Sequence, residues 1–130
     1  MRRRGLVLAD THCGGIGGLS PPGYTIVEEV RTIQETFWKW FTESLERYAP
    51  FDFVFGLGDF TDGEGKKGTL DTAYSNVKKQ AEAAAKILRY TEVDPKYIYL
   101  VRGTPFHSNG PCEYEDAIGQ ELGCSVEDTQ

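Results

Sequence analysis

Three short apolar runs alternate with two long amphipathic segments along this chain, and that order limits the folds open to it. The runs are GLVLA at 5–9, FDFVFGLG at 51–58 and YIYLV at 97–101. Each has the length and composition of a strand. Strands that alternate with helices predict right-handed crossovers and a mainly parallel sheet. We therefore expect an α/β fold, with a mainly parallel sheet and flanking helices.

The segments between the runs repeat their apolar residues at steps of three and four, as one face of a helix does. This spacing predicts helices over 26–48 and 70–90, and a shorter one over 113–122. Pro50 follows the first helix because proline cannot continue the hydrogen-bond ladder. The stretch FWKWF at 37–41 could stack on nucleic-acid bases, but its spacing favours packing on the sheet. Trp38 and Trp40 cannot both lie on one narrow face of that helix.

Length and charge narrow the class of protein. With 130 residues the chain is expected to form one domain, and its net charge of -6 argues against broad electrostatic attraction to nucleic acid. The apolar stretch after MRRRG is too short for a signal peptide, and no run approaches the about 20 residues that span a bilayer. We expect a cytoplasmic protein that does not bind membranes.

The cysteines do not indicate a disulfide framework or a zinc ribbon. Cys13, Cys112 and Cys124 are an odd number at wide spacings, without a C-x-x-C pair. We expect reduced thiols. Cys13 lies beside His12, so it could reach a metal ion, although a buried core thiol is the simpler interpretation.

Each apolar run ends in residues that bind metals or transfer protons. These residues are Asp10 and His12, then Asp59 and Asp62, then Thr104 and His107. Because the carboxyl ends of parallel strands meet at one edge of a sheet, we expect a shared site there. Carboxylate oxygen with imidazole nitrogen suits Mn²⁺, Fe²⁺ or Zn²⁺. Two such ions can clamp a phosphate ester and lower the pKa of a bound water.

Each of these residues also has a simpler interpretation. Asp and His are common in loops after strands, where they cap helices or form turns. Asp62 could make an Asx-turn before Gly63, and His107 could be a solvated loop histidine. EGKKG at 64–68 could contact a substrate phosphate, but a flexible solvated loop is the simpler reading.

The three loops together resemble the motifs of the calcineurin-like metallophosphoesterases. That family carries D-x-H, then G-D-x-x-D, then G-N-H-D/E, each after a strand. Residues 10–12 match the first motif and 58–62 the second, while GTPFH at 103–107 matches the third in part. The resemblance implies that 1–130 is the N-terminal half of an αββα sandwich, incomplete at its C-terminus.

The resemblance also implies roles for individual residues. Asp10 and His12 would bind a first ion, Asp59 would bridge two ions, and Asp62 would orient a ligand. Thr104 stands where the family has an Asn that binds the second ion, and Thr is a poorer ligand.

His107 would correspond to the catalytic histidine of the third motif, but Pro105 and Phe106 intervene before it. The family's further metal-binding histidines come from its second half, and no histidine follows His107 in this chain. A missing C-terminal half or a partner subunit would then complete the site.

These features predict a metal-dependent phosphoesterase that hydrolyses phosphomonoesters or phosphodiesters with a metal-activated hydroxide. The substrate class includes nucleotides and nucleic acids. By itself the chain is expected to be weakly active or inactive. The alternatives are a catalytically inactive relative that serves as a protein-interaction module, and a non-functional fragment.

Overall fold

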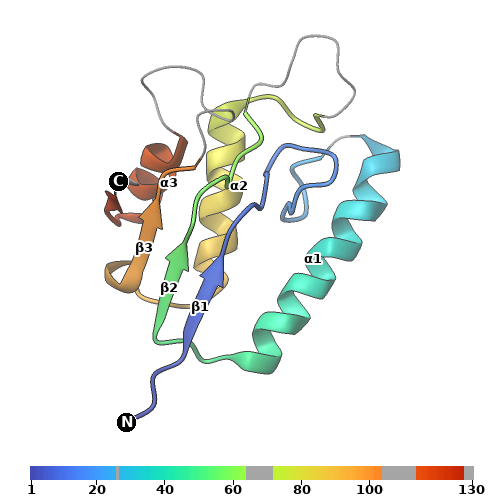
Figure 1. The fold of residues 1–130 in the computed structure, drawn as a ribbon. Coiled ribbons are helices and arrows are strands. Elements are labelled where there is room, and N and C mark those ends of the chain that lie inside the picture. Colours follow the sequence, from blue (N-terminus) through green and yellow to red (C-terminus); the bar gives the residue numbers. More distant parts are fainter. Residues whose placement is uncertain (26, 64–71, 104–113, 128–130) are drawn as a thin grey trace.

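A computed structural model describes residues 1–25, 27–63, 72–103 and 114–127 of the chain. Parallel strands form its sheet, in the order in which they occur along the chain (Figure 1). They are β1 (Gly5–Leu8), β2 (Phe53–Gly56), β3 (Ile98–Val101) and the two-residue β4 (Val126–Glu127). The expected α/β fold with a parallel sheet is thus confirmed. β4 was not predicted, because two residues are too short to give an alternating pattern.

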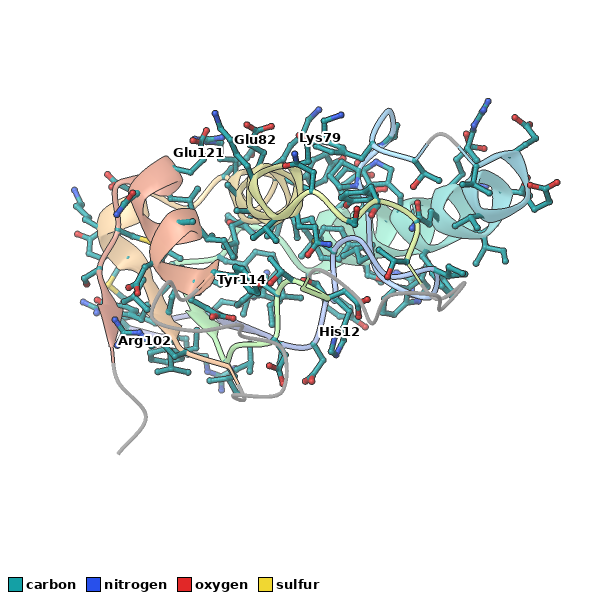
Figure 2. The ribbon with its side chains drawn as sticks, turned by 90° about the horizontal axis from the view of Figure 1, so that it is seen from above. His12, Lys79, Glu82, Arg102, Tyr114 and Glu121 are labelled. Carbon is teal, nitrogen blue, oxygen red and sulfur yellow. The ribbon has the colours of Figure 1, made fainter. Side chains whose placement is uncertain are left out.

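Three α-helices accompany the sheet. They are α1 (Glu28–Tyr48), α2 (Val77–Arg89) and α3 (Tyr114–Leu122), and a 3₁₀ turn, η1 (Pro95–Tyr97), precedes β3. Seen from above, the helices lie on one side of the sheet (Figure 2).

Two helices differ from the predicted bounds at their N-termini. α2 does not extend back to the predicted start, because residues 72–76 are not helical. Asn76 caps the helix instead, and its side chain accepts a hydrogen bond from the backbone N–H of Lys79. α1 begins at Glu28, two residues later than predicted, with Val27 in extended conformation at its cap.

One face of the sheet is buried and the other is open. Val54, Ile98 and Leu100 point to the helices and are at most 2% exposed. On the opposite face Phe55 and Tyr99 are more than 40% exposed, because no helix of the described chain covers it. The core therefore lies between the sheet and the helices, where α2 contributes mainly alanines and so approaches closely.

Only part of the apolar stripe of α1 reaches this core. Phe41 and Leu45 are buried, and Trp38 packs on Phe41 and Tyr90 with ring centroids 5.7 and 5.4 Å apart. Trp40 is 67% exposed instead. The two tryptophans thus lie on different faces, as predicted.

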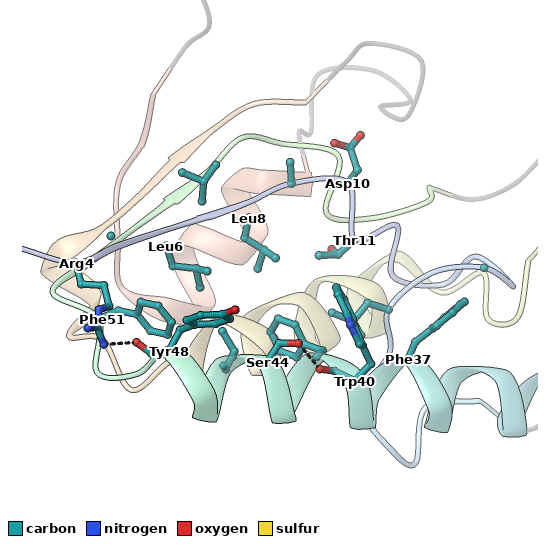
Figure 3. A pocket seen from close by; sticks show the side chains of 17 residues that line it. Arg4, Leu6, Leu8, Asp10, Thr11, Phe37, Trp40, Ser44, Tyr48 and Phe51 are labelled. Atoms are coloured by element: carbon teal, nitrogen blue, oxygen red, sulfur yellow. Dashed lines mark hydrogen bonds between the residues drawn. The ribbon is translucent and has the colours of Figure 1, made fainter.

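Exposed aromatic residues of α1 line a groove between that helix and β1, where Figure 3 shows Phe37, Trp40 and Tyr48. The groove has a volume of about 710 Å³ and is mainly apolar. Its lining includes Asp10 and Thr11, which follow shortly after β1. This apolar space therefore adjoins the strand ends where the polar motifs lie.

Candidate metal centre

The two strand ends that carry the first two motifs stay paired after β1 and β2 end. The backbone N–H of His12 donates to the carbonyl of Asp59 at 3.1 Å, and the N–H of Asp62 donates to the carbonyl of Cys13 at 2.9 Å. The Thr11 hydroxyl is buried and donates to a further carbonyl of the second segment at 2.9 Å. Parallel pairing therefore carries both motifs to one edge of the sheet, as the sequence predicted.

The backbone is strained at the predicted metal ligands. Asp10, His12 and Asp59 have φ values of 53°, 44° and 52°, in the left-handed region. Within the described residues, Glu92 is the one other non-glycine residue with a positive φ. Such conformations cost on the order of 1–3 kcal/mol each and concentrate at functional sites. The strained backbone conformations thus occur at Asp10, His12 and Asp59, the residues that the motifs identify as metal ligands.

His12 lies between two carboxylates. Its Nε2 is 3.7 Å from Oδ1 of Asp10, and its Nδ1 is 3.7 Å from Oδ1 of Asp62. Two donors that bind one ion at about 2.1 Å, at an angle of about 110–120°, are separated by about 3.4–3.6 Å. The Asp10 and His12 atoms are therefore spaced almost as two ligands of one cation require. The side chain of Asp10 is 68% exposed, so an ion there is open to solvent on one side.

Asp59 follows β2 and lies against the end of β3. A Cβ atom added at Gly103 would meet Oδ1 of Asp59 at 2.3 Å, so no side chain fits at that position. Gly58 and Gly103 are also in close contact, since a Cβ at Gly58 would lie 2.5 Å from the Gly103 Cα. Glycine at both positions lets the second and third loops approach each other.

The predicted site is only partly described. Thr104 and His107 lie outside the described residues, so their placement is not tested. Among the residues that the structure does describe, no three His, Cys, Asp or Glu side chains form a group that could hold a metal ion. The donors that do converge are one carboxylate and one imidazole, Asp10 and His12. This pair fits the chemistry of a divalent ion, and the family resemblance assigns a third ligand to Asp59 on the adjacent strand end.

A further carboxylate at this edge was not predicted. Glu115, in the first turn of α3, is 5% exposed, and its carboxyl lies near the backbone N–H groups of Phe60 and Gly103. Burial raises the pKa of this carboxyl, and the nearby charge of Asp59 raises it further. Glu115 thus lies beside both the second loop and the third. The signal in the sequence was an acidic residue early in the helix that follows the third loop.

Cys13 is a buried core thiol. It is fully buried, its Sγ lies 3.3 Å from the carbonyl oxygen of Leu19, and burial raises its pKa to about 12. A thiol with that pKa stays protonated near neutral pH, whereas metals bind the thiolate. The simpler of the two interpretations of Cys13 is therefore favoured.

No protein-family model matches the chain, and no curated protein matches it either. Within the described residues, no helix is long and apolar enough to cross a membrane. The functional interpretation therefore depends on the motifs and on the geometry of this edge of the sheet.

Proposed function

We propose that the carboxyl edge of the sheet binds a divalent cation and that the protein is a metal-dependent phosphoesterase. The observation that carries this proposal is the left-handed backbone at Asp10, His12 and Asp59. Three non-glycine residues in an unfavourable conformation, brought to one edge by continued strand pairing, are typical of a functional site rather than of ordinary loops.

In this proposal Asp10 and His12 hold the cation through Oδ1 and Nε2. Asp59 supplies a further carboxylate from the neighbouring strand end. Asp62 faces the other nitrogen of His12, so it favours the tautomer that leaves Nε2 available for the metal. A divalent ion held by these residues would make a hydroxide available near neutral pH and would neutralise charge on the phosphate.

The test is metal binding, followed by hydrolysis. Mn²⁺ is titrated into the full chain and its affinity is measured by calorimetry, with Asp59→Asn as the blank and Glu43→Gln as the control. Glu43 is an exposed α1 residue that pairs with Lys39, so its loss should change nothing at the site. The proposal is supported if Mn²⁺ binding is saturable, is weaker in Asp59→Asn and is unchanged in Glu43→Gln. Absence of saturable binding of Mn²⁺, Fe²⁺ and Zn²⁺ would overturn it.

The open face of the sheet supports a second candidate, a protein-interaction module without catalysis. Val7, Phe55 and Tyr99 expose 62%, 42% and 43% of their surface on that face. Exposed apolar patches commonly mark interaction sites. In the titration above, a chain that folds but binds none of the three ions would favour this candidate over the phosphoesterase.

A further inference from the structure

A buried glutamine of α2 joins the backbone segments at the candidate metal centre. Gln80 is fully buried. Its Oε1 accepts a hydrogen bond from the backbone N–H of Gly63 at 2.9 Å, and its Nε2 donates to the carbonyl of the same residue at 2.7 Å. Nε2 also donates to the carbonyl of Tyr74 at 2.8 Å. The side-chain amide of Gln80 therefore pairs with Gly63 as another peptide group would.

The same side chain packs against the segment that follows the first motif. A Cβ added at Gly14 would lie 2.2 Å from Nε2 of Gln80, and Gly14 has a φ of +100°. The carbonyl of Gly14 accepts from the N–H groups of Ala73 and Tyr74. Gln80 thus contacts three separate backbone segments, after the first motif, after the second motif and before α2.

An amide is an unusual choice for this position. The neighbouring buried residues of α2 are apolar, namely Ala81, Ala84, Ile87 and Leu88. A buried amide destabilises the fold unless it is hydrogen-bonded, so an apolar residue would be the simpler way to fill the core. The hydrogen bonds that its amide makes to the backbone of Gly63, next to Asp62, account for a glutamine at this position.

A short series of contacts links Gln80 to the predicted ligands. Gly63 is adjacent to Asp62, whose backbone N–H is bonded to Cys13, and whose carboxylate faces Nδ1 of His12. Movement of Gly63 would therefore move the carboxylate that faces His12.

We infer that Gln80 is a positioning residue of the metal centre, which fixes the segment Asp62–Gly63 against Cys13–Gly14 and so sets the orientation of Asp62 toward His12. This role rests on the proposed function, because the ion is what the orientation serves. Residues that orient metal ligands typically change affinity by about 10–100-fold when they are altered.

The test compares Gln80→Met, which keeps the length without the hydrogen bonds, with Gln80→Glu, which keeps the acceptor for Gly63 and loses the Nε2 donors. Ile87→Ala on the same helix is the stability control, because Ile87 is also fully buried and lies seven residues further along α2. Each full-length variant is checked for folding by circular dichroism, and Mn²⁺ affinity is measured below the unfolding temperature. We expect affinity to fall by about 10–100-fold in Gln80→Met, less in Gln80→Glu, and not in Ile87→Ala.

A second measurement does not depend on the metal. Amide hydrogen exchange is followed at Asp62 in the metal-free variants, because its N–H is bonded to Cys13 and not to Gln80. We expect faster exchange at Asp62 in both Gln80 variants than in Ile87→Ala of similar stability.

The outcomes separate the two proposals. If wild type binds none of Mn²⁺, Fe²⁺ and Zn²⁺ but Asp62 loses protection in the Gln80 variants, the proposed function fails and the positioning of Asp62 stands. The inference is overturned if Gln80→Met matches Ile87→Ala both in Mn²⁺ affinity and in amide exchange at Asp62, because Gln80 is then a core residue only. Where Gln80→Met does not fold, Gln80→Glu takes its place in this comparison.

Discussion

Nδ1 of His12 and Oδ1 of Asp62 lie 3.7 Å apart, although the two residues come from different strand ends. This distance exceeds a hydrogen bond, and a contraction of about 0.8 Å would make one. Carboxylates that face the distal nitrogen of a histidine fix its tautomer and raise its basicity as a ligand. In the proposed site this relationship would give Asp62, three residues after Asp59, the role of orienting His12.

We expect Asp59→Asn to weaken Mn²⁺ binding more than Asp62→Asn does. Asp59 would lose the charge of a direct ligand, whereas Asp62 would lose only its effect on His12, a change of about 10–100-fold. Calorimetric titration of both variants measures the difference. Equal losses would mean that Asp59 does not bind the ion directly.

The 130-residue chain is expected to hydrolyse phosphate esters slowly. In the proposed site Asp10, His12 and Asp59 would give a first ion three ligands, while a second ion would have Asp59 and Thr104, too few to hold it firmly. Loss of one ion of a pair removes several kcal/mol of charge stabilisation, and therefore orders of magnitude in rate. The assay uses a chromogenic phosphodiester and monoester with Mn²⁺ and subtracts Asp59→Asn. Fast turnover absent from that variant would show that other groups complete a two-metal site.

Gly14→Ala is expected to destabilise the protein by about 1–3 kcal/mol, because its φ is +100° and the new methyl group would meet the Gln80 amide. Gly17→Ala is the matched control, since nothing lies within 4 Å of a Cβ there. Its effect should stay within about 0.5 kcal/mol. Urea denaturation of both variants provides the comparison, and similar midpoints would contradict the close packing of Gln80 on Gly14.

Cys13 is expected to make stability fall at alkaline pH. Its pKa rises from 9.0 to about 12 on folding, so the folded chain holds its proton more tightly than the unfolded chain does. The resulting stabilisation is complete below pH 9 and is lost as the pH rises through about 12. Cys13→Ala should lack this part of the pH dependence in denaturation curves recorded from pH 8 to 11. If the stability of wild type and Cys13→Ala changed with pH in the same way, the pKa of the Cys13 thiol would not be raised by burial.

Thiol labelling gives an independent check on the same residue. In a Cys112→Ser background, Cys124 should react with iodoacetamide at pH 8 while Cys13 remains protected until the chain unfolds. Cys124 is partly exposed and Cys13 is buried, and both are free thiols.

The order and type of the elements could be predicted because the apolar periods of strands and helices differ along the chain. The start of α2 could not, since Tyr74 continues the helical spacing although it lies before the cap, which Asn76 provides. The left-handed backbone conformation of His12 could not be predicted from the sequence either. Non-glycine residues adopt it only where tertiary contacts impose it, here the pairing of the first segment with the second.

Gln80 and Glu115 were not predicted for a related reason. Both are polar residues within helices, where a sequence pattern suggests solvent exposure. Their burial becomes apparent only when the loops beside them are in place, because the backbone groups that they face are distant in sequence.

The continued pairing of the two strand ends has a consequence for folding thermodynamics. Thr11 and its partner carbonyl are 49 residues apart in sequence, so an ion held by both segments would close a long loop of the chain. Such an ion binds the native state and not the disordered chain, and at 100 times its dissociation constant it adds about 2.7 kcal/mol to the free energy of unfolding. The concentration of the ion would then set how much of the chain is folded, before any substrate arrives.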